Sequence, residues 1–178
     1  MNQPIIVTSE KSRYVSLSVL SFVMTLLSNF CIFAYSNEWH LSVLSLVFTV
    51  FGLIGVVLFG WFFVCYTKCV FVKQLPPILV VDDKGITDKS SAISIGFIPW
   101  EDITYIRLKP HLNQTYISVT LTDNDKYLSK MNVFQKYSSK ANLKMGFPLV
   151  NIVLMTSNQT PQQVYSAILH QYGDKFIQ

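Results

Sequence analysis

Residues 14–67 determine the architecture of this chain. They contain two runs, YVSLSVLSFVMTLLSNFCIFAY over residues 14–35 and LSVLSLVFTVFGLIGVVLFGWFFVCYT over residues 41–67. Neither run contains Asp, Glu, Lys or Arg. A helix rises about 1.5 Å per residue, so about 20 apolar residues cross the roughly 30 Å hydrocarbon core of a bilayer. The sequence predicts a transmembrane hairpin with helices over residues 14–35 and 41–66 and an outer loop over residues 36–40.

Two other interpretations fit parts of this stretch. A hairpin buried in the core of a soluble protein would have shorter apolar runs. A signal peptide is suggested by Lys11, Arg13 and the small residues Ala34 and Ser36, but its apolar segment is typically about 7–15 residues long. Both runs exceed that length, so we expect both helices to be membrane spans.

Basic residues flank the hairpin and are absent from its loop. Lys11 and Arg13 precede the first run, and Lys68 and Lys73 follow the second. Because cytoplasmic flanks of membrane spans are enriched in Lys and Arg, this distribution places both termini in the cytoplasm. We therefore expect residues 1–13 to form a cytoplasmic tail.

Small residues recur in both predicted helices and suit a close helix–helix contact. The residues that we expect in this contact are Ser21, Thr25 and Ser28 in the first helix and Gly52, Gly55 and Gly60 in the second. The glycine face would equally suit contact between two copies of the chain, so a homo-oligomer stays open. Because the spans hold no Asp, Glu, Lys or Arg, we interpret the hairpin as an anchor rather than an ion pathway.

Residues 68–77 form a linker, and residues 78–178 have the pattern of one cytoplasmic domain. We expect strands at residues 78–81, 86–87, 93–100, 104–109, 116–122 and 149–155, an inserted helix at residues 126–145, and a C-terminal helix. This order predicts the α+β class, as an antiparallel curved sheet or small barrel. We also expect residues 74–178 to fold without the hairpin.

The C-terminal helix carries the strongest local signal. Thr160 is a favourable N-cap, Pro161 suits the first helical position, and Gln163 completes a capping box. Its apolar stripe comprises Val164, Ile168, Leu169 and Tyr172.

Two segments of the domain carry a family resemblance. They read PPILVVDDKGITD over residues 76–88 and GFIPWEDI over residues 96–103. They resemble segments of uncharacterised two-span bacterial membrane proteins whose C-terminal part is similar to a bacterial pleckstrin-homology-like (PH-like) domain. The resemblance implies a PH-like fold and a multi-pass protein of the bacterial inner membrane, and it implies no known activity.

The residues that mark these segments are Gly85, Pro99, Trp100 and Asp102. We expect structural roles for them: Gly85 supplies a positive φ in a turn, Pro99 lies at a strand end, and Trp100 anchors the core. PH domains that bind phosphoinositides carry clustered Lys and Arg in the first hairpin loop. The matching turn here, residues 82–85, reads DDKG and is acidic, which argues against inositide recognition.

The sequence lacks the common catalytic and cofactor motifs. It has no glycine-rich phosphate loop and no Gly-x-Ser-x-Gly turn. Its three histidines are isolated, and the neighbouring carboxylates of Glu101 and Asp102 would point to opposite faces of a strand. From Lys68 onward the chain has 12 Lys or Arg and 8 Asp or Glu, an excess too small to indicate nucleic-acid binding. We therefore expect no catalytic residue, no metal and no cofactor.

Five lysines follow one another without an intervening acidic residue: Lys126, Lys130, Lys136, Lys140 and Lys144. At about 100° per residue, one helix over residues 126–145 would place all five within an arc of about 120°. Another flank would pack against the sheet and comprises Tyr127, Met131, Phe134, Ala141 and Met145. We predict that the lysine face contacts anionic lipid headgroups. A basic face exposed only to water is the alternative.

These patterns favour a non-enzymatic interaction module. The hairpin would anchor it in the lipid bilayer, and the domain would bind a protein partner through an edge strand or a groove. A membrane immunity protein that protects against a pore-forming toxin is the alternative, since two closely linked spans suit that role as well. An enzyme is the least favoured class, because no catalytic constellation is present.

Overall fold

The computed structural model describes residues 3–36 and 42–176, and the chain forms two compact units. One unit is the helical segment Glu10–Leu75. The other joins Met1–Ser9 to Pro76–Gln178, and we call it the α+β domain. Most of the loop predicted at residues 36–40 lies outside the described residues.

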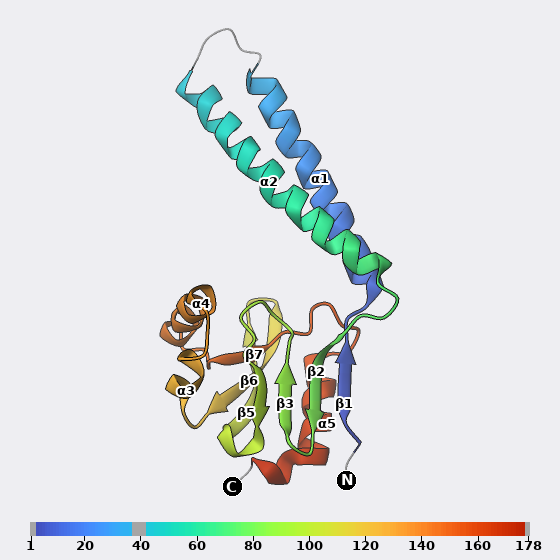
Figure 1. The fold of residues 1–178 in the computed structure, drawn as a ribbon, viewed down its shortest axis with the longest axis vertical. Helices are drawn as coiled ribbons and strands as arrows, with labels where there is room; N and C mark the ends of the chain where they lie inside the picture. Colours follow the sequence, from blue (N-terminus) through green and yellow to red (C-terminus); the bar gives the residue numbers. More distant parts are fainter. Residues whose placement is uncertain (1–2, 37–41, 177–178) are drawn as a thin grey trace. The chain divides into compact units, whose positions relative to one another are not determined.

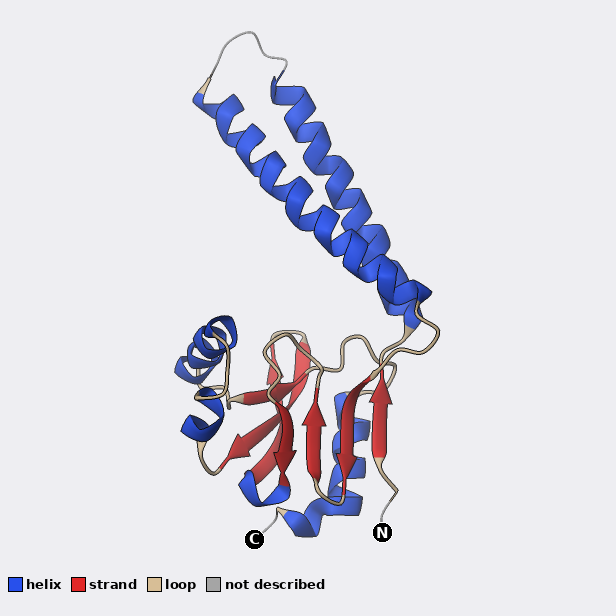
Figure 2. Ribbon diagram, viewed as in Figure 1, coloured by secondary structure: helices blue, strands red, loops and turns tan. Residues whose placement is uncertain are grey.

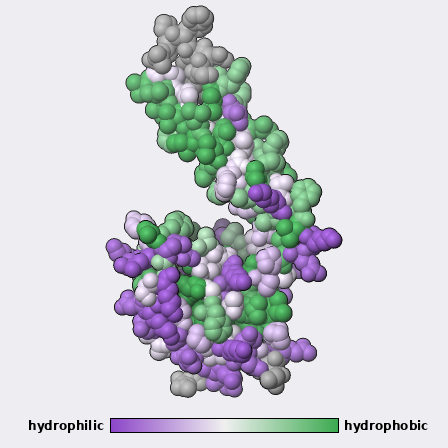
Figure 3. All heavy atoms as spheres, viewed as in Figure 1, coloured by the Kyte–Doolittle hydropathy of each residue, from purple (hydrophilic) through white to green (hydrophobic). Residues whose placement is uncertain are grey.

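The helical unit is a hairpin of α1 (Lys11–Ser36) and α2 (Val43–Phe71), which pack against each other (Figure 1). Both helices are long and apolar enough to cross a membrane. Phe30, Phe51 and Trp61 are 66%, 68% and 67% exposed, and apolar residues dominate the visible hairpin surface (Figure 3). A core helix of a soluble protein buries such side chains. The predicted pair of long apolar helices is confirmed. α1 extends past both predicted ends, whereas α2 begins two residues later than predicted and extends to Phe71, into the predicted linker.

Glycine and serine form the closest part of the α1–α2 contact. A Cβ at Gly52 would lie 3.0 Å from the carbonyl oxygen of Ser28, and a Cβ at Gly55 would collide with the Ser28 hydroxyl. These two glycines therefore allow the helices to approach. A Cβ at Gly60 would have no neighbour within 4 Å, so Gly60 lies outside this contact.

Hydroxyl groups satisfy one another or the helix backbone inside the hairpin. The hydroxyl oxygens of Ser18 in α1 and Thr67 in α2 are 2.7 Å apart and share a hydrogen bond. Thr25 donates to the carbonyl oxygen of Ser21 at 2.8 Å, and Ser21 is buried. The hydroxyl groups of Ser18, Thr67 and Thr25 are thus paired in an otherwise apolar unit.

The N-terminal segment Ile5–Thr8 forms strand β1 rather than a tail. It pairs antiparallel with β2 (Pro77–Asp82), which follows the hairpin in the chain. Ile6 is half exposed, whereas Val7 is fully buried in the core. The predicted tail over residues 1–13 is therefore wrong for these residues, and the predicted domain over residues 78–178 lacks one of its strands. The pairing gives the edge of β2 a hydrogen-bonding partner.

The first sheet contains β1, β2, β3 (Gly85–Asp88) and β4 (Gly96–Pro99) in that order, all antiparallel (Figure 2). In the β2–β3 turn, the Asp82 carboxylate accepts hydrogen bonds from the N–H groups of Lys84 and Gly85 at 2.8 and 3.2 Å. A Cβ at Gly85 would collide with the carbonyl oxygen of Ile98 in β4. Glycine is therefore required where β3 approaches β4, and Pro99 ends β4 as expected.

The second sheet contains β5 (Ile103–His111), β6 (Gln114–Leu121) and β7 (Val150–Ile152) in the order β5-β6-β7. Ile117, Val119 and Leu121 of β6 are buried, as their alternation predicts. β5 continues through Pro110, which an edge strand tolerates. The α+β class with antiparallel sheets is confirmed. Within residues 3–36 and 42–176 no strand pairing joins the two sheets, so the small-barrel alternative is not observed.

The helix predicted at residues 126–145 is two helices, α3 (Asn124–Leu128) and α4 (Val133–Lys144). The Asp123 carboxylate caps α3 by accepting from the N–H groups of Asp125 and Lys126. Asn132 then starts α4 with a capping box, in which Asn132 and Gln135 each accept from the backbone N–H of the other. The five lysines therefore do not share one helix, and their predicted common arc is wrong.

Helix α5 (Pro161–Tyr172) packs against β1, β5 and β6. Its capping box is confirmed, because Thr160 and Gln163 each accept a hydrogen bond from the other's N–H. Tyr172 is fully buried, and its hydroxyl donates to the carbonyl oxygen of Gln3 at 3.3 Å. α5 thus covers strands of both sheets and ties the N-terminal segment to the core.

Candidate functional site

Trp100, the largest residue of the family-like segments, is a core residue. It lies in a 3-10 turn directly after β4 and is 7% exposed. Its ring stacks on those of Tyr172 and Phe176, with centroids 5.4 and 5.7 Å away, and Nε1 donates to the carbonyl oxygen of Asp82 at 2.9 Å. Both the apolar ring and the polar N–H of Trp100 therefore make contacts inside the domain.

Asp102 fastens α3 to the same turn. Its Oδ2 accepts from the Tyr127 hydroxyl at 2.5 Å and from the Lys126 ammonium at 2.6 Å. The hydrogen bonds from Lys126 and Tyr127 lower the pKa of Asp102. Burial, reinforced by the Asp102 carboxylate, raises the pKa of Tyr127. Asp102 therefore makes an ion pair with Lys126 and a hydrogen bond with Tyr127, and together they hold α3 against the turn.

A second carboxylate, Asp88 at the end of β3, organises the loop between β3 and β4. Asp88 is 1% exposed and accepts from the N–H of Ser90 at 2.9 Å, and burial raises its pKa. Ser90 Oγ accepts from the N–H of Val153 at 2.9 Å, which joins the loop to the segment after β7. Gln135 of α4 donates to the carbonyl oxygen of Ser94 in the same loop at 3.4 Å. The loop therefore supports both α4 and the groove described next.

A groove of about 280 Å³ lies within the α+β domain and is its best candidate for a binding site. It is lined by Ser91, Ile93, His111, Tyr116, Asn142, Met145, Phe147, Asn151 and Val153. These residues come from the β3–β4 loop, the β5–β6 hairpin, the end of α4 and the segment around β7. They are too far apart in the chain to form a motif, so no local sequence pattern indicates this groove.

The groove combines apolar walls with a few polar groups, as binding sites commonly do. The rings of His111 and Phe147 meet edge to face with centroids 4.9 Å apart, and Lys109 Nζ lies 4.0 Å from the Phe147 centroid. Asn151 already makes two hydrogen bonds inside the domain. In the described part of the chain, the side chains of His111 and Asn142 make no hydrogen bond to protein atoms. These two side chains can therefore hydrogen-bond a ligand.

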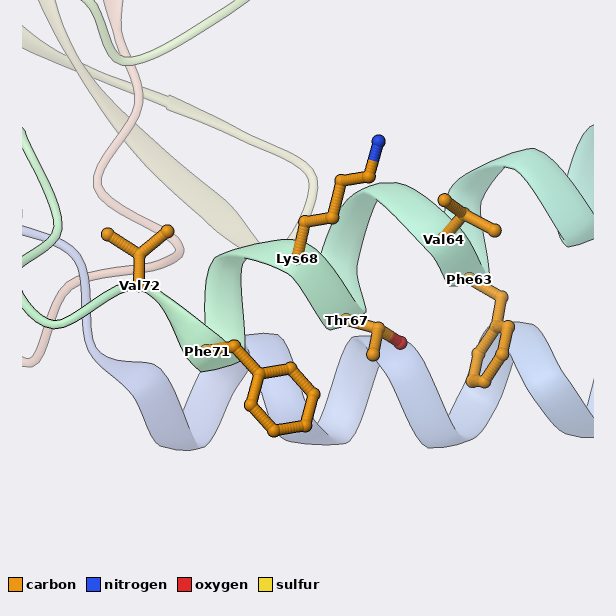
Figure 4. Close-up of a pocket in the computed structure, with 6 residues that line it drawn as sticks. All are labelled: Phe63, Val64, Thr67, Lys68, Phe71 and Val72. Carbon is orange, nitrogen blue, oxygen red and sulfur yellow. The ribbon is translucent and has the colours of Figure 1, made fainter.

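A larger cavity, of about 510 Å³, lies along the end of α2. It is lined by Phe63, Val64, Thr67, Lys68 and Phe71 of this helix and by Val72, which directly follows it. Val64 and Lys68 point to one side of α2, and Phe63 and Phe71 point to the other (Figure 4). The side chains of one helix do not enclose a ligand, so we assign no ligand to this cavity.

The lysines predicted at the membrane surface lie at two different helices. Lys126 is ion-paired and Lys130 follows α3, whereas Lys136, Lys140 and Lys144 are exposed on α4. Of the residues predicted to pack against the sheet, Phe134 and Met145 are 65% and 64% exposed, so the prediction is wrong for them. Tyr127 is buried and Met131 packs against the core, as predicted. α4 meets the domain through its other side, where Ser139 is fully buried and Leu143 packs against the core.

Comparisons with models of known protein families, with curated proteins and with solved structures found no match for this chain. Among the residues that the structure describes, no three His, Cys, Asp or Glu side chains are grouped so as to hold a metal ion. The parts of the molecule that could contact a membrane or a partner are the hairpin, the groove and the exposed face of α4.

Proposed function

We propose that this protein is a membrane-anchored interaction module without catalytic activity. Its hairpin spans the bacterial inner membrane, both termini lie in the cytoplasm, and the α+β domain binds a protein partner in the groove at Phe147. Two antiparallel sheets followed by α5 support the proposed PH-like fold. The structural roles of Gly85, Pro99, Trp100 and Asp102 support it as well, because these residues carry the resemblance.

The observation that carries this proposal is the pairing of β1 with β2. β1 ends at Thr8, shortly before α1 begins, and β2 begins at Pro77, shortly after α2 ends. The hairpin is therefore an insertion between two neighbouring strands of one sheet. Two spans that cross a bilayer and return leave both ends on one face of it, as a single sheet requires. This connectivity supports a domain that is held at one membrane surface by two helices.

The groove supports the binding part of the proposal. Phe147 and Met145 offer apolar contacts, while His111 and Asn142 offer unused hydrogen-bonding groups. A short extended peptide presents both an apolar side chain and backbone amide groups, which matches this combination. Asp102 accepts hydrogen bonds from both Lys126 and Tyr127, and this structural role supports a domain without catalytic activity.

The topology can be tested with acceptor sites that the chain already contains. Asn113 and Asn158 each begin an Asn-x-Thr sequence, and both side chains are exposed. Translated into microsomes, the protein should be glycosylated at neither site. A flexible acceptor segment inserted between α1 and α2 serves as the positive control and should be glycosylated. Modification of Asn113 or Asn158 would place the domain on the wrong side and contradict the proposal.

The partner can be sought by photo-crosslinking in cells. A photoreactive amino acid at Met145, on the rim of the groove, should give one discrete protein adduct. The same amino acid at Gln162, an exposed position on α5, is the control and should not give that adduct. Loss of the adduct in a Phe147→Ser variant would locate binding in the groove, and its persistence would contradict the proposal. Protection of cells from a pore-forming toxin by parent and Phe147→Ser variant alike would instead favour the immunity alternative.

A further inference from the structure

The outward side of α4 is an apolar patch. Val133, Phe134 and Tyr137 are 88%, 65% and 78% exposed. At about 100° per residue, these three side chains fall within an arc of about 100° on the side opposite the buried Ser139. Single exposed apolar residues are common on soluble proteins, but a contiguous group marks an interaction surface. We call these three residues the α4 patch.

Positive charge borders the α4 patch. Lys136 and Lys140 lie on one flank of it, and Lys144 lies within the same face. All three lysines are exposed, and α4 contains no Asp or Glu. Aromatic and aliphatic side chains bordered by lysines are typical of a helix that lies in the interface of a membrane. The single sign of the charge favours a negatively charged surface as the partner.

The short link between β1 and α1 limits how far the α+β domain can lie from the membrane. Only Ser9 and Glu10 separate β1 from α1, and two extended residues span at most about 7 Å. Because β1 is part of the sheet, this link cannot lengthen without breaking the β1–β2 pairing. A hairpin inserted in a bilayer therefore keeps the α+β domain beside the lipid headgroups.

We infer that α4 is a second membrane-contact element, which inserts the α4 patch among the headgroups of an anionic bilayer. The inference rests on the proposed function, because insertion of the hairpin in the bilayer is what places the domain next to lipid. Lys136, Lys140 and Lys144 pair with lipid phosphates, while Phe134 and Tyr137 reach the boundary of the acyl chains. Together with the hairpin, this contact gives the domain two attachments and limits its rotation at the surface.

The test uses the full chain in liposomes and a fluorophore attached to Tyr137→Cys. The native cysteines Cys31, Cys65 and Cys69 are first replaced by serine. Nitroxide-labelled lipids should quench the fluorophore several-fold more strongly than they quench one attached to Gln162→Cys on α5. This quenching should appear with phosphatidylglycerol in the bilayer and weaken at high salt. It should be lost when Lys136→Glu, Lys140→Glu and Lys144→Glu are combined.

The other outcomes overturn the inference in distinguishable ways. A fluorophore on Phe51→Cys in α2 reports whether the hairpin is in the bilayer. Quenching at Phe51 with none at Tyr137 contradicts the inference and leaves the anchor intact, whereas no quenching at either position contradicts the proposed anchor. Protection of Tyr137 from aqueous iodide without quenching by lipid would mean that protein covers α4. Equal quenching in purely zwitterionic liposomes would contradict the role of the lysines.

Discussion

Strand β1 and helix α4 both carry consecutive apolar residues at the periphery of the α+β domain, but they differ in whether those side chains are buried. β1 has four residues, and its Val7 is fully buried. α4 has twelve residues, and its Val133 and Phe134 are 88% and 65% exposed. Apolar character alone therefore does not decide burial. The difference lies in what the backbone of each segment can do.

The backbone N–H and C=O groups of an isolated strand have no partners within the strand. They therefore hydrogen-bond to a neighbouring strand, whatever the side chains are. β1 pairs with β2 in one register, and the alternation of a strand then turns Val7 toward the core. A helix satisfies its own backbone and needs only one face for packing. α4 uses Ser139 and Leu143 for that face and leaves its most apolar side chains outside. The exposed residues are thus the informative ones for function.

A charge in the buried side of β1 should destabilise the domain most. Val7→Asp places an unpaired charge in the core and should lower the free energy of unfolding of the α+β domain by about 3–5 kcal/mol. Ile6→Asp, on the exposed side of the same strand, should change it by less than about 1 kcal/mol. Pulse proteolysis of the full-length protein in urea measures both variants. Equal stability of the two variants would show that β1 is not part of the core.

A smaller effect concerns the attachment of α3, which precedes α4. Tyr127→Phe removes a hydrogen bond to the charged Asp102 carboxylate and should lower the free energy of unfolding by about 1.5–3 kcal/mol. Tyr137→Phe is the matched control, since this tyrosine is 78% exposed. It should leave the urea midpoint unchanged. A Tyr127→Phe protein as stable as the parent would mean that Asp102 does not hold α3.

The buried carboxylate of Asp88 should make stability depend on pH. Burial raises its pKa in the folded state above the usual value of 3.8, so the unfolded chain loses this proton more readily. The contribution of Asp88 to stability is therefore complete below 3.8 and is lost as the pH rises through the higher folded pKa. Asp88→Asn keeps an acceptor for the Ser90 N–H and should be more stable than the parent at neutral pH, with no gain in acid. Urea midpoints at both pH values measure this difference, and a variant that is less stable at neutral pH would contradict it.

Substitutions on the exposed side of α4 should change the stability of the domain least. Phe134→Ser combined with Tyr137→Ser should change the free energy of unfolding by less than about 0.5 kcal/mol, because both side chains are exposed. Ile168→Ser in α5, where the side chain is fully buried, is the contrast and should cost several times more. Destabilisation by the α4 substitutions comparable with that of Ile168→Ser would mean that the α4 patch packs inside the domain.

Much of the fold follows from local signals in the sequence. The uncharged runs identify the two long helices, and the capping residues Thr160 and Gln163 identify α5. The turn at Asp82 to Gly85 and the alternation of β6 locate strands, because these patterns depend only on neighbouring residues. The class of the domain follows from their order.

The rest depends on contacts between residues far apart in the chain. The partner of β1 lies beyond both apolar runs, so a short apolar segment at the N-terminus looks like a tail. The break between α3 and α4 depends on Asn132, whose capping role competes with a helix pattern that continues through it. The groove joins His111, Asn142 and Phe147 only after β5, α4 and β7 have assembled. Long-range pairing, and not composition, therefore creates the candidate site.

Hydrogen–deuterium exchange of the full-length protein in lipid nanodiscs tests most directly whether the hairpin interrupts a single domain. We expect the amides of β1 to be protected together with those of β2 and β3, because in a single domain the β1–β2 ladder opens only when the domain unfolds. Exchange of the β1 amides at the rate of an unstructured chain, while β2 and β3 stay protected, would contradict this expectation.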